Sequence, residues 1–98
     1  PVWTDIDQTY VLPFREGRDK DDQRHICPLQ IQTIERCVVL WSMESDIVLT
    51  PFAGVGSEVY VAVRNKRKAI GIELKSSYYR QMVKNVQMAT RAKEKLVQ

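Results

Sequence analysis

The chain has 98 residues, of which 44% are hydrophobic and 28% charged, values that are ordinary for one small globular domain. No apolar run approaches the roughly 18 residues of a membrane span, and no secretory signal is present, so a cytoplasmic protein that does not enter a membrane is expected. Cys27 and Cys37 form no C-x-x-C motif, and only one histidine is present. This composition argues against a structural zinc site and a structural disulfide, and no metal site is expected.

The net charge of +3 conceals an uneven distribution along the chain. Residues 1–63 hold 5 basic and 10 acidic side chains, whereas residues 64–98 hold 10 basic and 2 acidic side chains, a net charge of +8. Such an excess fits a nearby polyanion such as nucleic acid, and it fits a solvated helix equally well.

Residues 1–24 are expected to form an extended connector, because the segment is rich in charge and shows little hydrophobic periodicity. It begins with Pro and lies before any folded element, which suggests a fragment or a processed product. Its scattered apolar anchors are Trp3, Ile6, Tyr10, Val11, Leu12 and Phe14.

Residues 25–98 are expected to form the folded part. His25-Ile26-Cys27-Pro28 leads into a helix, and residues 42–45 form the turn that follows this helix. Apolar residues recur in the helix at spacings of three and four, which predicts one buried face. The members of that face are Ile31, Ile34, Cys37, Val38 and Trp41.

Residues 46–73 are expected to form one βαβ unit. The apolar run 47–49 predicts a short strand, and the glycine-containing stretch 50–57 predicts a tight turn. A helix is expected over 57–65, followed by a second short buried strand over 68–73. In such a unit the strands are parallel, and ligands bind at their carboxyl ends.

The turn and the end of the second strand carry the binding chemistry. Gly54 and Gly56 permit close backbone approach, and the helix amino terminus beyond them suits a phosphate or a carboxylate. Glu73, at the end of the second strand, is placed to accept hydrogen bonds from both hydroxyls of a ribose. The unit therefore predicts a site for an adenosine-containing cofactor. Val59 stands where a dinucleotide fingerprint has its third glycine, which disfavours NAD and an oxidoreductase fragment, and no Gly-Lys-Ser/Thr follows as in a P-loop.

A long final helix is expected after Ser76, its predicted N-cap. Its expected apolar stripe consists of Tyr79, Met82, Val83 and Val86. Basic residues fall along another face, at Arg80, Lys84, Arg91 and Lys95.

The order of helix, strand, Pro-Phe-Ala-Gly-Val-Gly turn, helix and Gly-Ile-Glu-Leu resembles the cofactor-binding half of a DNA amino-methyltransferase, of the adenine-N6 or cytosine-N4 type. The phage and prophage branch of this restriction-modification family is the most similar, and the resemblance runs from about Arg24 to Asn85. The connector before it is similar to the segment that joins the target-recognition and catalytic half, absent here, to the cofactor half. It implies an α/β chain with a partial Rossmann-like methyltransferase fold, in which parallel strands with flanking helices form an incomplete sheet. It also implies S-adenosyl-L-methionine as cofactor and double-stranded DNA as substrate of the intact enzyme.

The resemblance assigns cofactor contacts residue by residue. The family's turn is usually Asp-Pro-Phe-x-Gly-x-Gly-Thr/Ser, and Thr50 here replaces the Asp. Glu73 matches the ribose-binding residue and Leu74 lies beside the adenine, whereas the segment from His25 lines the methionine part. The complete set of implied cofactor-binding residues is His25, Ile26, Cys27, Thr50, Pro51, Phe52, Ala53, Gly54, Gly56, Ser57, Glu73 and Leu74.

The family's catalytic motif is missing from the chain. That motif is Asp/Asn/Ser-Pro-Pro followed by an aromatic residue that stacks on a flipped base, and none of the four prolines here is paired. The chain is therefore expected to contain no catalytic residue and to be inactive alone. We expect the missing catalytic half, or a second copy, to join along the edge of the 47–50 strand. The alternative is a non-catalytic module that binds S-adenosylmethionine or DNA and acts through a partner.

Overall fold

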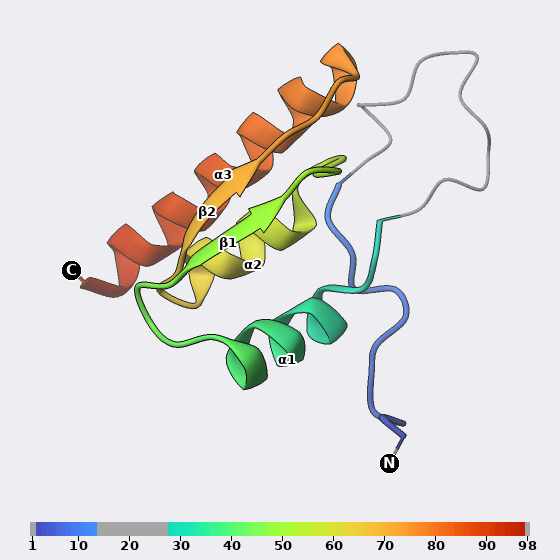
Figure 1. Ribbon diagram of the computed structural model, residues 1–98, viewed down its shortest axis with the longest axis vertical. Coiled ribbons are helices and arrows are strands. Elements are labelled where there is room, and N and C mark those ends of the chain that lie inside the picture. Colours follow the sequence, from blue (N-terminus) through green and yellow to red (C-terminus); the bar gives the residue numbers. More distant parts are fainter. Residues whose placement is uncertain (1, 14–27, 98) are drawn as a thin grey trace.

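The computed structural model describes residues 2–13 and 28–97, with side chains as far as Arg91. Its elements, in chain order, are α1 (Ile31–Trp41), β1 (Ile47–Thr50), α2 (Ser57–Arg64), β2 (Lys68–Gly71) and α3 (Ser76–Val97) (Figure 1). The predicted α/β class and order of elements are confirmed. No helix within the described ranges is both long enough and apolar enough to cross a membrane.

The two strands pair in parallel, with Ile47 opposite Lys68 and Thr50 opposite Gly71. Hydrogen bonding continues beyond the strand end, because the Ile72 N–H donates to the Thr50 carbonyl at 3.0 Å and the Ala53 N–H donates to the Ile72 carbonyl at 2.9 Å. The second strand is thus shorter than the predicted 68–73, although its backbone stays paired as far as Ile72. The crossover through α2 makes the predicted βαβ unit.

Helix α2 is the centre of the packing. It packs against both strands and lies between α1 and α3, so the helices cover a single face of the sheet (Figure 1). One buried cluster joins the N-terminal segment, α1 and α2, and its members are Leu12, Ile31, Ile34, Val38, Val55 and Val61. A second joins the turn, α2 and α3, and its members are Ala53, Val59 and Met82.

The opposite face of the sheet is uncovered. Its side chains Ile47, Leu49, Ile70 and Ile72 are between 49% and 64% exposed. The prediction of a buried second strand is therefore wrong for this face. Parallel sheets normally have both faces covered, and here only one is. Within the described residues β1 pairs only with β2, which confirms the expected open edge of the first strand.

Two predicted helix faces need correction. On α1, Cys37 and Trp41 are exposed, and the buried face consists of Ile31, Ile34 and Val38 alone. On α3, Tyr79 and Val83 are exposed, and the buried face lies at a spacing of four residues instead. It comprises Ser77, Gln81, Asn85 and Ala89, together with Met82. The buried face differs from the expected apolar stripe because three of its positions, Ser77, Gln81 and Asn85, are polar.

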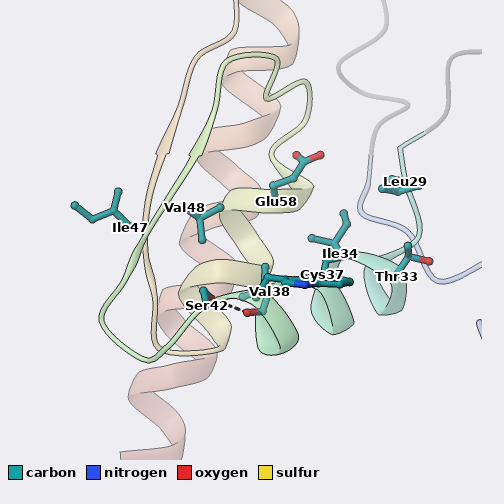
Figure 2. A pocket seen from close by; sticks show the side chains of 10 residues that line it. Leu29, Thr33, Ile34, Cys37, Val38, Ser42, Ile47, Val48 and Glu58 are labelled. Atoms are coloured by element: carbon teal, nitrogen blue, oxygen red, sulfur yellow. Dashed lines mark hydrogen bonds between the residues drawn. The ribbon is translucent and has the colours of Figure 1, made fainter.

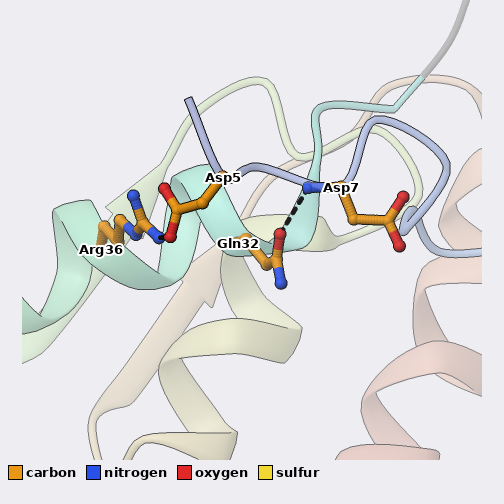
Figure 3. A network of polar contacts seen from close by, with 4 residues as sticks. All are labelled: Asp5, Asp7, Gln32 and Arg36. Carbon is orange, nitrogen blue, oxygen red and sulfur yellow. Dashed lines mark hydrogen bonds and ion pairs between the residues drawn. The ribbon is translucent and has the colours of Figure 1, made fainter. Parts of the chain in front are cut away.

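The N-terminal segment is not a free connector in its described part. The Ile31 N–H donates to the Tyr10 carbonyl at 3.0 Å, and the Asp7 N–H donates to Gln32 Oε1 at 2.6 Å (Figure 3). Asp5 forms an ion pair with Arg36, and this hydrogen bond lowers the pKa of the Asp5 carboxyl. Residues 5–10 therefore lie along α1.

The two turn glycines differ in the space around them, which gives a stability test. A Cβ at Gly56 (φ +89°) would lie 2.5 Å from Met82 Cγ, whereas a Cβ at Gly54 (φ +56°) would meet nothing within 4 Å. Gly54→Ala should lower the free energy of unfolding by about 1–2 kcal/mol through backbone strain alone. Gly56→Ala should lower it by about 2–5 kcal/mol, since overpacking adds to the same strain. Urea denaturation measures both, and equal losses would contradict the Met82 contact.

Candidate functional site

The site lies where β1 and β2 end and α2 begins. The turn between β1 and α2 is closed by the Gly56 N–H, which donates to the Ala53 carbonyl at 2.8 Å. Gly56 occupies the N-cap position of α2 in the left-handed conformation, and its residue type offers no side-chain cap. The first N–H groups of a helix have no partner within the helix, so this end favours an electron-rich ligand group.

Glu73 closes the site from the end of β2. Its Oε2 accepts from the Gly54 N–H at 2.7 Å, and its Oε1 accepts from the Lys75 N–H at 3.0 Å. A carboxylate has about four acceptor positions, so two remain for a ligand. The predicted ribose contact therefore stays open, and the structure adds a role that the sequence did not suggest, which is to hold the turn.

Two large apolar side chains flank this end of the sheet. Phe52 follows β1 and is 88% exposed, and Leu74 follows β2 and is 97% exposed. Thr50 and Ser57, in contrast, are buried in the turn. The described residues bring together no group of three or more His, Cys, Asp or Glu that could hold a metal ion. The arrangement offers backbone donors, one carboxylate and exposed apolar surface.

Nine of the predicted site residues thus belong to the turn or to the end of β2 beside it. They are Thr50, Pro51, Phe52, Ala53, Gly54, Gly56, Ser57, Glu73 and Leu74. The other three, His25, Ile26 and Cys27, lie outside the described residues. Cofactor contact by all twelve remains a prediction.

Asn85 of α3 was not predicted to matter to the turn. It is completely buried, and its Nδ2 donates to the Val55 carbonyl at 2.9 Å. The i, i+4 spacing of Gln81 and Asn85 was a visible signal of a polar helical face. Sequence alone gave no indication that this face is buried, because the carbonyl that Asn85 binds lies 30 residues away.

Apart from the glycine turn, a groove lies between α1 and β1, beside the open edge of the sheet (Figure 2). Its volume is about 510 Å³ and its surface is mostly apolar. The lining residues are Leu29, Thr33, Ile34, Cys37, Val38, Trp41, Ser42, Ile47, Val48 and Glu58. Cys37 and Trp41, which were expected in the core, therefore border this groove.

Comparison with known proteins identifies the family. The model of the N6/N4 DNA methylases, described as DNA methylase, matches residues 2–84. The chain belongs to the N6/N4 DNA methylase family. The match includes residues 2–24 of the predicted connector, for which a resemblance to a joining segment of the family was also expected. The division of the chain at residue 24 remains a prediction.

Two relatives from Bacillus amyloliquefaciens are similar to most of this methylase chain. The type II methyltransferase M.BamHI is 34% identical over 73 residues, which are 74% of this chain and 16% of the relative. The orphan methyltransferase M.BamHII is 37% identical over 60 residues, which are 61% of this chain and 23% of the relative. The methylase chain thus spans less than a quarter of either relative.

Solved structures show the same arrangement. TTHA0409 of Thermus thermophilus, a candidate DNA modification methylase in complex with S-adenosyl-L-methionine, is 33% identical with a TM-score of 0.60. The aligned part covers 62% of this methylase chain and 26% of that protein. The M1.HpyAVI–SAM complex has a TM-score of 0.61 at 24% identity, covering 71% of this chain and 34% of the other, and shows likeness of fold.

The double role of the Glu73 oxygens gives a test of the turn. Glu73→Gln replaces one acceptor by an NH₂ group, which cannot accept from a backbone N–H, so the free energy of unfolding should fall by about 1–2 kcal/mol. Amide exchange at Gly54 or Lys75 should accelerate. Glu44→Gln is the matched control, because Glu44 is exposed and lies 3.9 Å from Lys66, and it should change stability by less than about 0.5 kcal/mol. Equal stability of the two variants would contradict the role of Glu73 in the turn.

Proposed function

We propose that this chain is the S-adenosyl-L-methionine-binding part of a cytoplasmic DNA methyltransferase that methylates adenine N6 or cytosine N4. The observation that carries the proposal is the position of the Glu73 carboxylate at the glycine turn, in a chain of the N6/N4 DNA methylase family. The S-adenosyl-L-methionine in the TTHA0409 complex supports this choice of cofactor.

Each part of the site has a counterpart in the cofactor. The free acceptor positions of Glu73 receive the ribose hydroxyls, and the exposed side chains of Phe52 and Leu74 cover the adenine. The amino end of α2 favours the methionine carboxylate, with the segment His25–Cys27 nearby in the family pattern. The reaction is a direct displacement by the exocyclic amine, for which this chain supplies positioning. The chain contains no Pro-Pro pair and is inactive by itself.

The partner in this proposal is the rest of the methylase, which pairs with the open edge of β1 and brings the DNA. Asp46 and Thr50 direct their carbonyls to β2. Since backbone groups alternate along a strand, those of Ile47 and Leu49 point towards the open edge. The apolar groove beside that edge and the small share of each relative that the chain spans both support this assignment.

Cofactor binding is tested by calorimetric titration of the chain with S-adenosylhomocysteine, the product form. We expect saturable one-to-one binding that Leu74→Ala weakens by about 1–2 kcal/mol, since an apolar contact with the adenine is lost. Leu74 is almost fully exposed, so its truncation leaves the fold intact and the affinity reports direct contact. Met43→Ala is the control, because Met43 is also exposed but precedes β1 at the opposite end of the strand.

Absence of binding by the folded chain would contradict the proposed cofactor site in this chain. Equal affinities of the Leu74 variant and the unchanged chain would remove Leu74 from the site and leave the rest of the proposal in place.

The open edge is tested with Leu49→Pro. The backbone N–H of Leu49 points away from β2, towards the open edge. Proline at this position removes that N–H without removing a hydrogen bond between β1 and β2. We expect the unchanged chain to restore DNA methylation when mixed with the remaining part of its parent methylase, and the variant to fail while retaining its circular dichroism spectrum. Association without methylation would favour the non-catalytic module. Self-association that the variant abolishes would instead identify a second copy as the partner.

A further inference from the structure

We infer that Asn85 is a positioning residue that sets the shape of the glycine turn for cofactor binding. This inference rests on the proposed function, and it assigns the rigidity of the turn to a side chain on α3, outside the sequence motif.

The amide of Asn85 has its two hydrogens committed to two separate segments. Its Nδ2 donates to the Val55 carbonyl at 2.9 Å and to the Pro13 carbonyl at 3.2 Å. Both partners are acceptors, so the orientation of the amide is fixed by chemistry. One fully buried side chain therefore joins the glycine turn, the N-terminal segment and α3.

Gln81 orients this amide from one turn earlier in α3. Its Nε2 donates to Asn85 Oδ1 at 3.1 Å, and both side chains are buried. A buried polar pair of this kind is costly unless satisfied, and here the Asn85 amide uses both donors and one acceptor position. The pair forms a connected polar network within an otherwise apolar contact.

The peptide unit that Asn85 holds joins Val55 to Gly56, the second of the two glycines with positive φ. A peptide is planar, so fixing the Val55 carbonyl also fixes the direction of the Gly56 N–H. That N–H donates to the Ala53 carbonyl at 2.8 Å, so the plane is held at both ends. Rotation of this plane changes ψ of Val55 and φ of Gly56, and a glycine at 56 offers little resistance to a change of φ. The hydrogen bond from Asn85 therefore determines how the amino end of α2 is presented.

The test uses Asn85→Asp, which keeps the shape of the side chain and replaces its two N–H donors by at most one O–H donor, that of a protonated carboxyl. We expect S-adenosylhomocysteine to bind about tenfold more weakly, because a buried carbonyl loses its partner. Without cofactor, amide hydrogen exchange at Gly54 and Gly56 should be about tenfold faster, while exchange in the centre of α2 changes less. Gln81→Met, which removes only the orienting donor, should change both quantities in the same direction by about threefold.

Ala89→Gly is the matched control for loss of stability. Ala89 is equally buried on the same face of α3 but takes no part in the polar network. This variant should lower the melting temperature and accelerate exchange throughout the molecule, while the affinity of the folded protein for S-adenosylhomocysteine remains unchanged.

The outcomes separate this inference from the proposed function. Unchanged affinity in Asn85→Asp overturns the inference and leaves the cofactor site in place. If the unchanged chain binds no S-adenosylhomocysteine, the proposed function fails in this chain, and amide hydrogen exchange in Asn85→Asp decides on the role of Asn85. Acceleration confined to Gly54 and Gly56 supports a role in positioning the turn, whereas uniform acceleration overturns the inference. If Asn85→Asp does not fold, the same measurements on Gln81→Met decide.

Discussion

The hydrogen bond between the Gly54 N–H and the Glu73 carboxylate is the constraint on which the site depends. It joins the residues that follow two parallel strands, at 2.7 Å, where backbone pairing has just ended. The second carboxylate oxygen holds the Lys75 N–H and so directs the chain towards α3. One side chain thereby fixes the exit from β1 and the exit from β2. The same carboxylate keeps acceptor positions for a ligand, so in the proposed function structure and binding share one residue.

The packing around this constraint is one-sided. Helix α2 separates α1 from α3 and covers one face of the sheet, and the other face presents exposed isoleucine and leucine side chains. A parallel sheet in water normally buries both faces and protects its edges. The uncovered face, the open edge of β1 and the groove beside α1 therefore form a continuous region suited to further protein. The chain also spans only a small share of the methyltransferases to which it is similar.

The helices and strands were predictable from the local sequence pattern, whereas several of the tertiary contacts that they make were not. Apolar runs and glycines placed β1, the turn and α2 correctly, because these signals are encoded within a few neighbouring residues. The burial of Trp41 and Tyr79 was predicted wrongly, since periodicity identifies an apolar face and cannot show whether anything covers it. Gln81 and Asn85 were missed for the converse reason. Polar residues are expected outside, and only the tertiary structure reveals carbonyls that satisfy them.

Glu73 and Asn85 both hold the turn, one as a hydrogen-bond acceptor and the other as a donor. The carboxylate accepts from the Gly54 N–H, and the amide donates to the Val55 carbonyl one residue later. Successive backbone groups are thus fixed by one acceptor from the end of β2 and one donor from α3. Apolar residues at 81 and 85 could fill the same space, but they could not orient the peptide plane between Val55 and Gly56. The glycine motif therefore supplies freedom of conformation, and residues outside the motif select the conformation that a ligand would meet.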